Sequence, residues 1–106
     1  MALTRDFKQT VQARAKAEPA FAKALLDEAT MLFLDGEAET AKLILRDLVN
    51  ATVGFEQLAA SMHKPSKSLH RMLSASGNPT MDNLSAIFAA LKIALKVEIR
   101  TRVVSA

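Results

Sequence analysis

Two cationic side chains, Lys67 and Arg71, are the residues of this sequence whose types and spacing best suit chemistry with a ligand. They stand four positions apart, so a helix through them would present both on one face. No Asp or Glu occurs between His63 and Thr80. Ammonium and guanidinium groups donate hydrogen bonds to phosphate oxygens and to the O6 and N7 atoms of guanine. The segment therefore predicts a surface for a polyanion, with duplex DNA as the expected partner.

Other kinds of site lack the residues that they need. The chain has no Cys, which excludes disulfides and thiolate metal sites, and its three Gly leave no phosphate-binding loop. His63 and His70 have no nearby acid to complete a metal site. The acids of residues 35–39 alternate over too short a stretch for a calcium loop, and no serine has the neighbours of a nucleophile. We therefore expect no catalytic activity, no metal and no cofactor.

Two short helices are predicted to hold the cationic pair. The first runs from Phe55 to Met62, a turn follows through His63–Lys64–Pro65, and the second runs from Ser66 to Ser74. At about 100° per residue, the apolar side of the second helix lies opposite Lys67 and Arg71. Its inward residues are Leu69, Met72 and Leu73, and its outward surface is completed by Ser68, His70 and Ser74. Two short helices joined in this way form the unit that DNA-binding proteins use to place the second helix in the major groove.

The rest of the chain is predicted to be mainly helical as well. Residues 1–50 form the N-terminal helices, with Phe7, Val11 and Ala15 on one face of the first. Pro19 suits the first turn of the next helix, and Gly36 marks its end. Residues 80–92 form the final helix, with Thr80 as its N-cap. We expect residues 1–106 to be a single domain, with residues 54–74 as a helix-turn-helix unit.

The C-terminal residues change period. Apolar or β-branched residues alternate with charged ones over residues 93–104, a pattern typical of a β-strand. A lone strand leaves its backbone groups unpaired, so we expect pairing with a second copy of the chain or with a partner protein, and the alternative is a frayed terminus. The residues predicted to face the dimer or partner are Leu95, Val97, Ile99, Thr101 and Val103.

The charge distribution agrees with a polyanion partner. The net charge of +3 arises from the second half of the chain, because residues 1–50 carry one acid more than they carry bases. The start of the chain has no apolar segment of a signal peptide, and no apolar run approaches the ~20 residues of a membrane span. We expect a cytoplasmic protein that does not bind membranes.

The sequence resembles the lambda-repressor-like helix-turn-helix proteins, and among them the HigA-like addiction-module antidote (antitoxin) proteins. The resemblance covers about residues 20–100. It is carried by Gly54–Phe55–Glu56–Gln57–Leu58–Ala59, by Ser66–Lys67–Ser68–Leu69–His70–Arg71–Met72–Leu73–Ser74, by Gly77–Asn78–Pro79 and by the helix that ends in Ala90–Leu91. The resemblance implies an all-α bundle of five or six helices, here followed by a short C-terminal β-strand.

The resemblance also implies roles for individual residues. Ala59 would be the small residue where the two helices cross, and Leu69 and Met72 would anchor the core. The side chains that would face DNA are Ser66, Lys67, His70, Arg71 and Ser74. Phosphate would be contacted by Gln57, Asn78 and the N-terminal amides at Thr80. The sequence departs from the pattern at His63 and Lys92, which stand where the family often has Gly, so His63 is expected to adopt a positive φ at some cost in strain.

These observations predict a transcriptional repressor that binds a palindromic operator as a dimer. The family resemblance adds that the protein is the antitoxin of a toxin–antitoxin pair. The alternative is an interaction module, or an antitoxin that acts mainly by binding a toxin protein, with little DNA binding. The acidic N-terminal half would then contact a basic partner.

Overall fold

The computed structural model describes residues 2–106, with side chains from residue 9 onward. Over these residues the chain forms six helices and no strand, so the predicted all-helical fold with five or six helices is confirmed. The helices are α1 (Ala2–Ala17), α2 (Pro19–Leu34), α3 (Ala38–Ala51), α4 (Phe55–Ser61), α5 (Ser66–Met72) and α6 (Met81–Leu95). The side chain of Phe7, predicted on the apolar face of the first helix, lies outside the described part.

Left-handed residues end three of the helices. Gly36 follows α2 with a φ of 88°, His63 follows α4 with a φ of 57°, and Lys96 follows α6 with a φ of 56°. Each allows the next amide to reach back five residues, as Glu37 N–H does to the Leu32 carbonyl at 2.8 Å. The prediction that His63 adopts a positive φ is confirmed. At His63 and Lys96 the left-handed residue carries a side chain, which makes this conformation strained.

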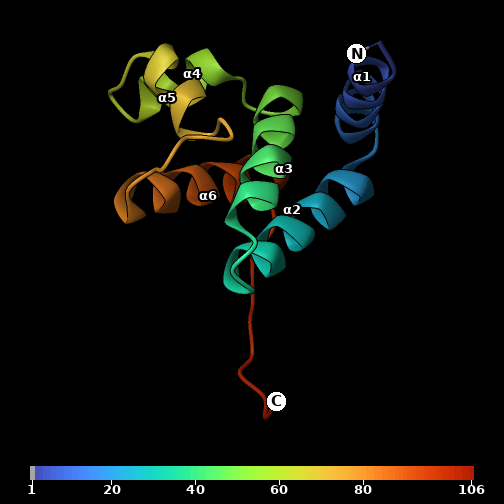
Figure 1. Ribbon diagram of the computed structural model, residues 1–106, viewed down its shortest axis with the longest axis vertical. Coiled ribbons are helices and arrows are strands. Elements are labelled where there is room, and N and C mark those ends of the chain that lie inside the picture. Colours follow the sequence, from blue (N-terminus) through green and yellow to red (C-terminus); the bar gives the residue numbers. More distant parts are fainter. Residues whose placement is uncertain (1) are drawn as a thin grey trace.

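The core forms where the first three helices pack together. α3 stands at the centre of the molecule, with α1 and α2 on one side and the shorter helices on the other (Figure 1). α2 begins with Pro19 at its first turn, as predicted. The fully buried Leu26, Leu45 and Leu48 join α2 and α3 to a single apolar cluster that also includes residues of α4, α5 and α6. This cluster gives the short helices a fixed base.

α4 and α5 complete the other side of the molecule. Leu58 and Leu69 are fully buried, and Ala59 is 2% exposed. Figure 1 places both helices at one end of the long axis, away from the C-terminus. α6 passes beneath them and contributes Ile87 and Leu91 to the same core. The predicted inward face of the second short helix is confirmed at Leu69 and Leu73, which are both fully buried.

The C-terminal segment differs from the prediction. α6 continues to Leu95, so the assignment of Ile93 and Leu95 to a strand is wrong. Leu84, Ile87, Leu91 and Leu95 follow one another at helical spacing, and this periodicity outweighs the alternation that begins within it. We call residues 97–106 the tail. No part of it forms a strand within the described chain, although Val97 and Ile99 are half-buried and their charged neighbours are exposed.

None of the described helices combines the length and the apolar character that crossing a bilayer requires.

Candidate nucleic-acid interface

The turn between α4 and α5 determines where α5 lies. Gly54, with a φ of 86°, precedes α4, and the left-handed His63 follows it. Lys64 N–H donates to the Ala59 carbonyl at 3.0 Å, and His63 N–H donates to the Ala60 carbonyl at 3.1 Å. Pro65 then precedes α5 in an extended conformation. These bonds satisfy the last carbonyls of α4 while the chain reverses, so the direction of α5 is set by backbone geometry.

A ring stack joins α5 to the start of α4. The imidazole of His70 lies parallel to the ring of Phe55, with centroids 3.9 Å apart and an interplanar angle of 12°. Phe55 is 5% exposed, so His70 covers a core residue with one face of its ring. The sequence predicted His70 to face DNA. The structure places it at the surface but in this packing role, which leaves only its edge and outer face for a ligand.

Lys67 and Arg71 occupy the outward face of α5. Both are exposed, and among the side chains that the structure describes, from residue 9 onward, neither makes an ion pair or a side-chain hydrogen bond. The opposite face of the helix carries Leu69 and Leu73, so α5 has no freedom to turn its cations inward. Ser66 and Ser68 flank the cations and are half-buried. The arrangement leaves two positive charges without an ion-pair partner on a helix that is packed against the core.

Hydroxyl groups near this face differ in what they can still donate. Ser74 Oγ donates to the Arg71 carbonyl at 2.7 Å, so its hydrogen is already used. Thr80 Oγ1 accepts from Asn83 N–H at 3.1 Å, which confirms Thr80 as the N-cap of α6. A hydroxyl that accepts in a cap still has its own hydrogen to donate to a phosphate oxygen. Gln57 in the first turn of α4 and Asn78 in the loop before α6 are both exposed.

Lys42 is a residue of this region that sequence reasoning missed. Its Nζ donates to the carbonyl of Ala75 at 3.3 Å and also to the carbonyl of Gly77. Lys42 belongs to α3, so these bonds join the centre of the molecule to the loop between α5 and α6. No local pattern signals a contact across more than thirty residues, since only the fold brings the two segments together.

Replacing Lys42 with Met should loosen this loop without disturbing the core. Met keeps the apolar stem but lacks the donors, so we expect a loss of about 1 kcal/mol in unfolding free energy, since the bonds are partly exposed. Urea denaturation measures the loss. Lys16→Met removes the same charge from an exposed position on α1 and serves as the matched control. Equal stability of the two variants would contradict the assigned role of Lys42.

The region shows no arrangement suited to metal chemistry. Among the described residues, no three His, Asp or Glu side chains gather in a way that could hold an ion. Acids nevertheless occur on the neighbouring helices, at Glu56 in the first turn of α4 and at Asp82 in the first turn of α6. The cationic character therefore belongs to α5 and the turn before it.

Comparison of the chain with family models, with curated proteins and with solved structures finds no match.

Proposed function

We propose that the protein binds duplex DNA through α4 and α5, which act as a helix-turn-helix unit of the lambda-repressor-like kind. One observation carries the proposal: Lys67 and Arg71 are exposed and make no ion pair, on a helix whose opposite face holds the fully buried Leu69. Such a helix can enter the major groove, because its docking surface is free and its orientation is fixed by the core. The expected ligand is duplex DNA, since its phosphates and guanine edges match these donors.

Each contact has a chemical basis in the proposed complex. Arg71 can donate two parallel hydrogen bonds to guanine O6 and N7, and Lys67 can donate to a phosphate or to a guanine edge. The Thr80 hydroxyl, Gln57 and Asn78 would donate to phosphates and so set the register of the protein on the duplex. Ser74 would contribute less, because its hydroxyl hydrogen is engaged by the Arg71 carbonyl.

A repressor function follows if two copies bind together. A dimer with a two-fold axis would present two copies of α5 to half-sites about 34 Å apart or a multiple of that distance, on a palindromic operator. Occupation of a promoter by this complex would block transcription without a ligand. We therefore propose a cytoplasmic, dimeric repressor of this kind.

Selection of bound duplexes from a random pool tests the proposal most directly. We expect a palindromic consensus, and binding to it should be about a thousandfold tighter than to random duplex at physiological salt. Fluorescence anisotropy over a range of salt concentrations measures both affinities, and the logarithm of the binding constant should fall with the logarithm of salt concentration. A pool that yields no enriched sequence, together with salt-independent affinity, would exclude the proposed function.

A second candidate function is neutralisation of a toxin protein. It is favoured by one observation: Met31 and Leu34 are 56% and 64% exposed on α2, close in sequence to the acids Glu28 and Asp35. An apolar face bordered by negative charge suits a basic protein partner. A neighbouring gene for a small basic protein, whose product co-purifies with this chain, would support this candidate. The two functions can coexist in one protein.

A further inference from the structure

The tail leaves a row of backbone groups without partners. Val97 N–H donates to the Lys92 carbonyl at 3.0 Å, the last such bond along the chain. From Glu98 onward, no backbone group forms a backbone hydrogen bond with any of residues 2–106. The segment nevertheless runs extended and projects from the body at the end of the long axis opposite α4 and α5 (Figure 1). An extended segment with free donors and acceptors can accept another strand along its edge.

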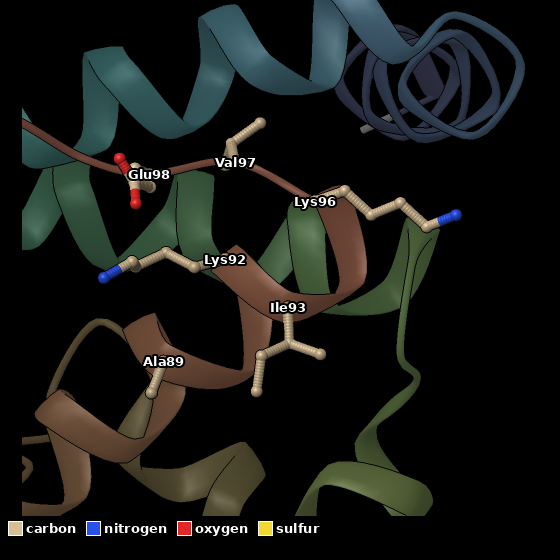
Figure 2. A pocket seen from close by; sticks show the side chains of 6 residues that line it. All are labelled: Ala89, Lys92, Ile93, Lys96, Val97 and Glu98. Atoms are coloured by element: carbon tan, nitrogen blue, oxygen red, sulfur yellow. The ribbon is translucent and has the colours of Figure 1, made fainter.

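The first part of the tail is held in place by its own chain. Val97 and Ile99 pack against the core cluster, and Glu98 between them is exposed. Figure 2 shows Val97 directed toward α2, whereas Ile93 projects from α6 in another direction. Ile93 is 78% exposed and borders a shallow, open groove between α6 and the start of the tail, which Lys92, Lys96 and Glu98 also line. The edge of the tail is therefore fixed in position and has apolar surface next to it.

The last part of the tail lies at the surface of the molecule. Residues 101–106 are all exposed, and Val103 and Val104 are 100% and 69% exposed. One chain thus carries both an unpaired edge with an open groove beside it and an apolar end without a surface to cover it. We propose that the tails of two copies pair antiparallel, so that the end of each copy covers the groove of the other.

A register centred on Ile99 brings only opposite charges together within residues 97–101. Centring the pair on Ile99 places Glu98 opposite Arg100 of the second copy, twice by symmetry, and places Ile99 opposite its own copy. Centring it on Arg100 would pair Glu98 with Arg102 of the second copy, but it would also place two arginines directly opposite each other, which is unfavourable. In the isolated chain Glu98 and Arg100 form only a local ion pair at 3.0 Å, with both side chains largely exposed. With Ile99 at the centre, Val103 and Val104 extend past Thr101 toward the end of α6 and its exposed Ile93.

The pairing deepens the proposed function, since it rests on the expectation of a dimer and assigns its interface. It can be tested without DNA, so its failure is distinct from a failure of DNA binding. Sedimentation velocity of the full chain should show a dimer at micromolar concentration. Deletion of residues 101–106 keeps Val97 and Ile99 in the core and should give a folded monomer. A monomeric full chain, or a truncated chain that stays dimeric, would overturn the proposal.

Reversed charges test the register itself. Glu98→Arg places arginines opposite each other in both cross-strand pairs, and Arg100→Glu places glutamates there. Each variant alone should dimerise about tenfold more weakly than the natural chain. An equal mixture should form a heterodimer as tight as the natural dimer, because both pairs then join opposite charges. Circular dichroism checks that each variant keeps its helices. Weakened variants that fail to recover on mixing would refute this register.

Discussion

A chain carrying both Lys67→Ala and Arg71→Ala should lose at least about a hundredfold in affinity for its selected duplex. Each side chain that reads a base contributes about 1–3 kcal/mol, and removal of both eliminates the positive charge that they carry on α5. The two single variants separate the kinds of contact. A variant that has lost a base contact should bind competing sequences almost as well as the selected one. For a variant that has lost a phosphate contact, the slope of the logarithm of the binding constant against the logarithm of salt concentration should be smaller by about one.

The structure supplies controls for this experiment. Lys67 and Arg71 are exposed, so their removal should change the unfolding free energy by no more than about 0.5 kcal/mol. Lys16→Ala removes one positive charge from an exposed position on α1 and matches each single variant in net charge. Unchanged DNA affinity of the double variant, with Lys16→Ala equally unchanged, would show that α5 does not meet DNA through this face.

Of the glycines in the described chain, Gly77 should be the one at which replacement by Ala destabilises the protein most. A Cβ at Gly77 would lie 2.8 Å from the carbonyl carbon of Met72, and closer still to the carbonyl oxygens of Met72 and Arg71. These are backbone atoms at the end of α5, which cannot move aside as a flexible side chain would. We expect a loss of about 3 kcal/mol and a fall in Tm of about 10–20 °C, measured by thermal circular dichroism.

Gly36→Ala is the matched comparison for this substitution. Gly36 has a φ of 88°, but an added Cβ would meet no atom within 4 Å. The cost there is backbone strain alone, about 1–2 kcal/mol. Gly77 has no such φ, so a larger loss at Gly77 than at Gly36 isolates the close approach of the loop to α5. A larger loss of stability at Gly36 than at Gly77 would contradict the close packing of this loop against α5.

Local patterns in the sequence were sufficient to predict most helices and the inner face of α5. The four-residue spacing of Leu69 and Leu73 predicts a short helix with both residues inward, and both are fully buried in the structure. Pro19, Gly36 and Thr80 marked helix ends because their conformational or capping properties act within one turn. His63 was predicted to be left-handed from its place in the turn, and it is.

Features that depend on distant contacts could not be predicted in this way. The bonds from Lys42 to the loop and the stack of His70 on Phe55 join segments that meet only in the folded chain. The end of α6 was misplaced because Leu95 fits both a helical and an alternating pattern, and its packing against the core extends the helix, while Ile93 stays exposed. Whether DNA meets α5 stays a prediction, since a free cationic face is necessary for binding but is not binding itself.

The position of the free tail has a practical consequence for anyone who handles this protein. A purification tag or reporter domain fused after Ala106 would join residues 101–106, which are all exposed, so the helices should tolerate it. The same fusion would extend the strand through which we propose that two copies meet, and its bulk would crowd that edge. An untagged chain is therefore the right material for measuring self-association, and a bulky C-terminal fusion offers a way to keep the protein in single copies.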